Sequence, residues 1–154
     1  MSVSKLNPLV STICEKINLI ERYGDLHQKF SNSKSAISKI DKKEVLKILK
    51  PYGYPYKYSE GRYYFEEPYN EDISFLASIS PKGGSVMMYM NVKKDGEFLD
   101  LDSGGLHSIY RKKLGNELGS PIFYTTYEEL AVIVKEFFAI YEDFKKVVIE
   151  MFVV

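Results

Sequence analysis

Hydrophobic side chains recur every three or four positions near the start of the chain. Leu9, Ile13, Ile17 and Ile20 follow this spacing, which places them on one face of a helix. We expect that helix to begin at Asn7-Pro8, where Asn caps free amides and Pro is tolerated, and to end near Gly24. Helices therefore open the fold.

A second, shorter helix is predicted after a polar connection at residues 31–40. Asp41 and Glu44 have the spacing of a capping box at a helix start. The apolar face of this helix comes from Val45, Leu46 and Leu49, and Pro51 and Gly53 end it.

From Arg62 the hydrophobic period changes from that of a helix to that of a strand. Ile73, Phe75, Ala77 and Ile79 alternate with more polar neighbours, as expected when one side of an antiparallel sheet is buried. Asp95-Gly96 predicts a two-residue hairpin turn, because both positions tolerate positive φ. We expect four strands in meander order, then a short helix over residues 106–113 and a fifth strand at residues 122–124.

The last segment predicts a long amphipathic helix of about 22 residues, twice a mean helix length. Thr126 and Glu129 form a second capping box. The helix's apolar stripe consists of Leu130, Val134, Phe137, Tyr141, Phe144 and Val148.

Together these elements predict a single α+β domain over residues 1–154. Residues 1–53 form the helical part, residues 60–125 an antiparallel four- to five-stranded meander sheet, and residues 126–150 the C-terminal helix. The N-terminal helices and the C-terminal helix are expected to pack on one face of this sheet.

Composition excludes several classes of protein. The chain has 154 residues and one cysteine, Cys14, so no intrachain disulfide is possible. No segment approaches the roughly 20 apolar residues of a membrane span, and the N-terminus does not resemble a signal peptide. We therefore expect a cytoplasmic protein with no membrane partner.

Charge is balanced overall but unevenly distributed. The net charge is zero, yet residues 1–58 carry eleven Lys or Arg against five Asp or Glu, whereas residues 59–110 carry four against nine. Residues 51–69 hold seven of the thirteen tyrosines. Because the lysines of the basic part lie among aliphatic residues on its predicted helices and are not interleaved with aromatic residues, nucleic-acid binding is not expected.

Motifs for catalysis or cofactors are not evident. One cysteine and two histidines, His27 and His107, do not have the spacing of a zinc site, and no phosphate-binding glycine motif occurs. Glu66 and Glu67 are adjacent on a strand, so they point to opposite faces and cannot act on one substrate atom. We expect no cofactor, no metal and no enzymatic activity.

Tyrosine together with carboxylates favours a protein-binding surface, since tyrosine supplies rigid contact area and charge steers association. We expect this acidic, tyrosine-rich face to bind a basic protein. The residues predicted for it are Tyr63, Glu66, Glu67, Tyr69, Asp95, Glu97, Asp100 and Asp102.

Three segments, GRYYFEE, ISFLASISPKGGSVMMYMNVKKDGEFLDLD and YTTYEELAVIVKEFFAIYEDF, resemble small bacterial immunity proteins of polymorphic and contact-dependent toxin systems. The resemblance covers the chain from about residue 60 and lies in the arrangement of the segments. It implies a compact cytoplasmic protein that binds a cognate toxin domain and covers its active site. The neutral net charge departs from the strongly acidic members of that group.

Two other functions fit the sequence. One is a small-ligand protein or enzyme with a pocket near His107, where Ser108, Asp100 and Asp102 are close in sequence. The other is a regulatory domain that dimerises through the C-terminal helix. An immunity protein is expected to be a monomer or a weak homodimer.

Overall fold

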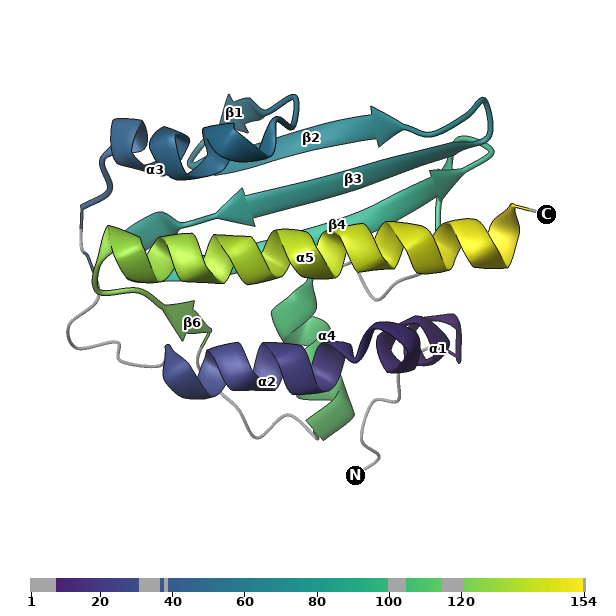
Figure 1. The fold of residues 1–154 in the computed structure, drawn as a ribbon, viewed down its shortest axis with the longest axis horizontal. Coiled ribbons are helices and arrows are strands. Elements are labelled where there is room, and N and C mark those ends of the chain that lie inside the picture. Colours follow the sequence, from purple (N-terminus) through teal and green to yellow (C-terminus); the bar gives the residue numbers. More distant parts are fainter. Residues whose placement is uncertain (1–7, 31–36, 38, 100–104, 115–120, 154) are drawn as a thin grey trace.

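The computed structural model describes residues 8–30, 37, 39–99, 105–114 and 121–153, and combines an antiparallel sheet with five α-helices (Figure 1). The elements in chain order are α1 (Pro8–Ile17), α2 (Leu19–Lys29), α3 (Lys42–Leu49), η2 (Lys50–Tyr52), β1 (Lys57–Ser59), β2 (Arg62–Pro68), β3 (Ile73–Ser80), η3 (Lys82–Gly84), β4 (Ser85–Lys94), β5 (Glu97–Phe98), α4 (Leu106–Leu114), β6 (Ile122–Phe123) and α5 (Tyr127–Phe152). The α+β class and the long C-terminal helix are confirmed.

The sheet is a meander in which β1 to β5 pair in sequence order, each antiparallel to its neighbour. Phe65, Ala77 and Met90 are aligned across three strands and are buried beneath the helices. The neighbouring positions point to the other face, because side chains alternate along a strand. The strand β1, which precedes Arg62, is an addition to the predicted sheet.

The outer edge of β4 is shared by three short segments. β5 pairs with its end, Gly105 bridges to Tyr89 in its middle, and β6 pairs with its start. Glycine at position 105 allows this close approach, because a Cβ there would lie 2.9 Å from Cε1 of Tyr89 and would require the ring to shift. The predicted helix at residues 106–113 and fifth strand near residue 122 are both present, as α4 and β6.

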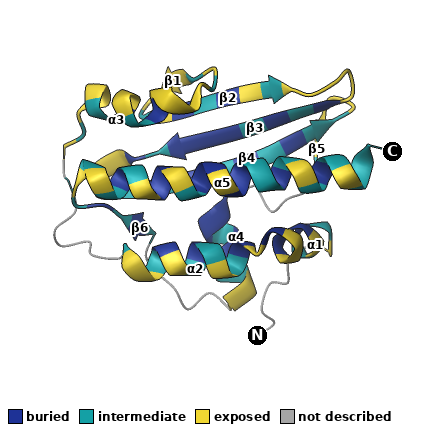
Figure 2. Ribbon diagram, in the orientation of Figure 1, coloured by how far each residue is buried: buried dark blue, intermediate teal, exposed yellow. Residues whose placement is uncertain are grey.

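Helix α5 crosses the sheet and supplies much of the core. Its 26 residues begin after Thr126, whose hydroxyl accepts a hydrogen bond from the amide of Glu129 at 3.1 Å. Figure 2 shows buried positions recurring along its length, and Tyr141 and Phe144 pack on Phe65 and Phe75 of the sheet. The buried positions are Leu130, Ile133, Val134, Phe137, Phe138, Ile140, Tyr141, Phe144 and Val148. This apolar face is therefore occupied by the protein's own sheet.

The N-terminal helix is divided where the sequence predicted one continuous helix. Asn18 adopts a left-handed conformation, with φ of 57°, and separates α1 from α2, which then continues past Gly24 to Lys29. Asparagine tolerates this conformation better than most residues, and its side chain donates to Glu21 at 3.0 Å. The break changes the direction of the chain between two helices that both pack in the core.

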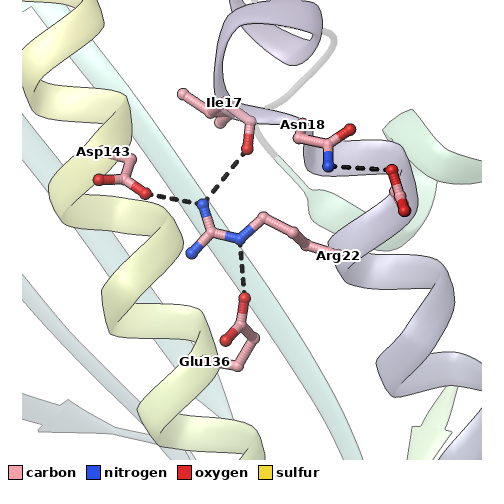
Figure 3. A network of polar contacts seen from close by, with 6 residues as sticks. Ile17, Asn18, Arg22, Glu136 and Asp143 are labelled. Atoms are coloured by element: carbon pink, nitrogen blue, oxygen red, sulfur yellow. Dashed lines mark hydrogen bonds and ion pairs between the residues drawn. The ribbon is translucent and has the colours of Figure 1, made fainter.

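Arg22 in α2 joins the N-terminal helices to α5 (Figure 3). Its guanidinium donates to Glu136 and Asp143, both at 2.7 Å, and to the carbonyl of Ile17 at 3.2 Å. The carbonyl belongs to the last residue of α1, where orphan acceptors require donors. One side chain therefore stabilises the junction of three helices.

Replacing Arg22 by Met is expected to lower the free energy of unfolding by about 1–2 kcal/mol. The Arg22 side chain is only 21% exposed, so its two ion pairs and its hydrogen bond contribute more to stability than a fully exposed ion pair does. Urea denaturation measures the change, and Lys29→Met, which removes an exposed charge from the same helix, is the control. Equal losses in the two variants would contradict a specific role for Arg22.

Several tyrosines of residues 51–69 serve the core. Tyr54 stacks on Phe65 with ring centroids 4.4 Å apart, and Tyr56 packs edge-on against the same ring. The Tyr54 hydroxyl donates to Glu142 at 2.5 Å and the Tyr56 hydroxyl to the carbonyl of Leu49 at 2.7 Å. These rings close the sheet against α3 and α5, with their polar atoms satisfied.

Candidate binding face

The sheet face turned away from the helices carries large side chains around a shallow cavity. We call this surface the open sheet face. The cavity has a volume of about 600 Å³. Its principal lining residues are Arg62, Tyr64, Leu76, Ser78, Tyr89, Asn91 and Phe98. Their position follows from strand alternation, since each is adjacent in sequence to a residue of the core.

A small residue between two large ones forms the centre of the cavity. Tyr64, Ser78 and Tyr89 are aligned across β2, β3 and β4, and Ser78 is 8% exposed at the base. Leu76 lies one position further along β3 on the same face, and Phe98 on β5 is 58% exposed. The face thus offers apolar surface and a central depression to another molecule.

Two turns meet at one end of the sheet and bring acidic residues together (Figure 1). The amide of Asp95 donates to the carbonyl of Asp72 at 2.8 Å, which ties the β4–β5 turn to the β2–β3 turn. Asn70 Oδ1 accepts from the amides of Asp72 and Ile73 and fixes the β2–β3 turn. Asp95 and Gly96 have φ of 55° and 83°, as predicted for this hairpin. We call Glu71, Asp72, Asp95 and Glu97 the acidic end.

All four carboxyl-bearing residues of the acidic end are exposed, and none forms an ion pair with a residue that the structure describes. Within those same residues no group of three or more His, Cys, Asp or Glu side chains could hold a metal ion. The negative charge at this end is therefore available to a positively charged surface.

The opposite end of the same strands is basic. Lys57 is paired with Tyr64, the Arg62 guanidinium lies 4.7 Å from the centroid of the Tyr64 ring, and Lys82 extends over Gly61. All three cations are exposed, and Glu60 is the acidic residue in the adjoining turn. We call Lys57, Arg62 and Lys82 the basic end. The acidic end and the basic end thus lie at opposite ends of the strands, with Glu97 aligned with Lys94 on the helix side of the sheet.

Three predicted site residues, Tyr69, Asp95 and Glu97, lie exposed at the acidic end of the sheet. Tyr69 packs edge-on against Phe75, so its ring is turned toward the helix side of the sheet. Asp100 and Asp102 lie outside the described residues.

The other three predicted residues do not share that surface. Tyr63 is 3% exposed and faces the core, which excludes it from any binding surface. Glu66 is on the open sheet face, where hydrogen bonds from Ser74 at 2.7 Å and Lys93 at 3.2 Å lower its pKa. Glu67 points to the helix side and bonds Tyr141 and Lys145. Alternation along β2 therefore separates residues that the sequence had grouped, and no single acidic, tyrosine-rich face includes all of them.

Sequence reasoning missed several exposed residues of the open sheet face and the acidic end. Glu71 and Asp72 follow Asn70 in the β2–β3 turn, and their acidic character was visible in the sequence. Tyr64, Tyr89 and Phe98 share the open sheet face, but only strand register brings these three rings to one side. The alternation of β2 could have separated Tyr64 from Tyr63.

His107 is buried between α2 and α4, at 7% exposure. Its Nδ1 lies 2.8 Å from the Tyr23 hydroxyl, and its ring stacks on that of His27 at 5.8 Å. Burial, together with electrostatic interactions with His27 and Arg111, lowers the pKa of His107 to about 4. This neutral, enclosed ring is not placed to meet a substrate from solution.

Comparison with known proteins identifies no relative. No protein-family model matches the chain, and neither a curated protein nor a solved structure shows significant similarity to it. Among the helices in the described parts of the chain, none has the length and apolar character needed to cross a membrane.

Proposed function

We propose that this chain is a non-enzymatic protein-binding domain, specifically an immunity protein that docks a cognate toxin on its open sheet face. One observation carries the proposal. No helix in the described parts of the chain lies over the face, which bears Phe98 at 58% exposure beside half-buried Tyr64, Leu76 and Tyr89. Aromatic residues that anchor in or around a depression supply much of the energy of protein interfaces.

Electrostatics support a partner with a basic contact surface near the acidic end. Glu71, Asp72, Asp95 and Glu97 are exposed on preformed turns, so little order has to be imposed on binding. Carboxylates in this position accelerate encounter with a positively charged protein and set its orientation. The toxin would first contact the acidic end and then bind over the aromatic rings of the open sheet face.

The proposal has a direct genetic test. We expect the product of the gene directly upstream to stop growth when expressed alone, and co-expression of this chain to restore growth. An upstream product that leaves growth unaffected would refute the immunity function, and so would one whose toxicity this chain does not relieve.

Phe98→Glu is expected to weaken binding to that toxin about 30-fold, the effect of losing one anchor of about 2 kcal/mol at an interface. Val132→Glu is the matched control, because Val132 is 51% exposed on α5 and distant from the open sheet face. Titration calorimetry measures both affinities, and circular dichroism verifies folding. Equal affinities for the two variants would place the binding site elsewhere.

A further inference from the structure

We propose that a second copy of this chain binds the open sheet face in the opposite strand direction and forms a dimer with two-fold symmetry. In this arrangement the acidic end of each copy lies against the basic end of the other. The inference does not rest on the immunity function, since it concerns the isolated chain.

The first argument is the order of charges along the strands. Glu71, Asp72 and Asp95 give the acidic end three exposed carboxyl groups on the turns beside the open sheet face, whereas the basic end carries three exposed cations beside Glu60. Lys93 at the acidic end is paired with Glu66, and Glu97 lies with Lys94 on the helix side of the sheet. The acidic end follows the last residues of β2 and β4, and the basic end lies by the first residues of β2. A two-fold axis that lies between the two sheets, parallel to their planes and perpendicular to the strands, exchanges these ends, so each favourable contact occurs twice.

The second argument is the shape and polarity between the two ends. Ser78 is the small residue between Tyr64 and Tyr89, and the depression it leaves can receive a side chain of the second copy. Leu76 and Phe98 add apolar area that is exposed in the single chain. Burial of such area drives association without a defined orientation, and the charges at the two ends provide that orientation.

The third argument is the overall charge, which distinguishes a second copy from other occupants. The chain has zero net charge, so two copies do not repel each other at long range. A single-stranded nucleic acid could stack on Tyr64, Tyr89 and Phe98, but its phosphates would meet the acidic end. A purely acidic or purely basic protein matches only one end of the face.

The test measures the mass of the purified protein by sedimentation equilibrium from micromolar to millimolar concentration. The 17.8 kDa chain is expected to approach twice that mass as its concentration rises, and less so in high salt. Two variants reverse the charge at one end each, Glu71→Lys with Asp72→Lys, and Lys57→Glu with Arg62→Glu. Each variant alone is expected to remain a monomer, because like charges then meet at both contacts.

Mixing the two variants in equal amounts is expected to restore a dimer. In the mixed dimer the two reversed ends meet each other, the two unaltered ends meet each other, and both contacts join opposite charges. Glu128→Lys with Glu150→Lys is the matched control for the acidic end. It makes the same net charge change at exposed positions of α5 and should still dimerise.

Three results would overturn the proposal: a wild-type chain that is monomeric over the whole range, end-reversed variants that dimerise as the wild type does, or a mixture that stays monomeric. If the purified chain instead binds a single-stranded oligonucleotide through this face and does not bind a second copy, the open sheet face would be assigned to nucleic acid. A toxin and a second copy would compete for the same open sheet face. The dimer is tested on the isolated chain and toxin relief by growth, so the two proposals can fail separately.

Discussion

Replacing Glu67 by Leu should lower the free energy of unfolding by about 2–3 kcal/mol, as expected when a buried polar network loses its shared acceptor. Glu67 Oε1 accepts from the Tyr141 hydroxyl at 2.6 Å and from Lys145 Nζ at 3.0 Å. Tyr141 is fully buried, and burial with this hydrogen bond raises its pKa. Leucine would leave the hydroxyl without an acceptor and would leave Lys145 with Glu142 alone.

Two variants make this prediction specific. Glu67→Gln keeps an acceptor for Tyr141 and should cost about 1 kcal/mol, the scale of one weakened charged hydrogen bond. Glu66→Leu changes the adjacent residue on the exposed face, where its ion pair with Lys93 is worth less than 1 kcal/mol. Urea denaturation compares the three. If Glu66→Leu lowers the free energy of unfolding as much as Glu67→Leu does, the loss comes from placing leucine in β2 and not from breaking the hydrogen bonds of Glu67.

The second prediction concerns the pH dependence of stability and depends on His107. Its pKa is lowered to about 4 in the folded chain, against about 6.5 when unfolded. Between these values the unfolded chain binds the proton and the folded chain does not. The stabilising contribution is therefore complete above pH 6.5 and is lost as the pH falls to 4, in total about 3 kcal/mol.

His107→Asn is the variant that isolates this effect, because its side-chain amide can donate to or accept from the Tyr23 hydroxyl, as the imidazole can, while it cannot bind a proton in this range. His27, Tyr110 and Arg111 also face the site and are unchanged in the variant. The free energy of unfolding, measured by urea denaturation, should change less between pH 7 and pH 4.5 for His107→Asn than for the wild type. Identical differences would mean that His107 is not the group responsible.

The fold was largely predictable because its hydrophobic periods are strong. Capping residues placed the start of α3 at Asp41 and that of α5 at Thr126, and alternation in residues 73–80 gave β3 its correct inner face. The break at Asn18 was not predictable in this way, since the apolar spacing continues through it and only the backbone reveals the left-handed residue.

The candidate site was predicted less well, because neighbours in sequence are not neighbours on a sheet. Tyr63, Glu66 and Glu67 lie within five positions, yet one is in the core, one is on the open sheet face and one faces α5. Conversely, Asp72 and Asp95 are far apart in sequence and joined by a backbone hydrogen bond. Strand register and the position of the helices determine which side chains share a surface, and neither follows from local pattern.

The way the outer side of β4 is paired has a consequence for aggregation. β5, Gly105 and β6 occupy most of its length, so a foreign strand finds few consecutive unpaired amides there. At the other extreme, β1 is only three residues long and begins with Lys57, and short, charged edges resist extension into fibrils. The open sheet face can therefore remain uncovered while the edges of the sheet limit the edge-to-edge growth that leads to amyloid.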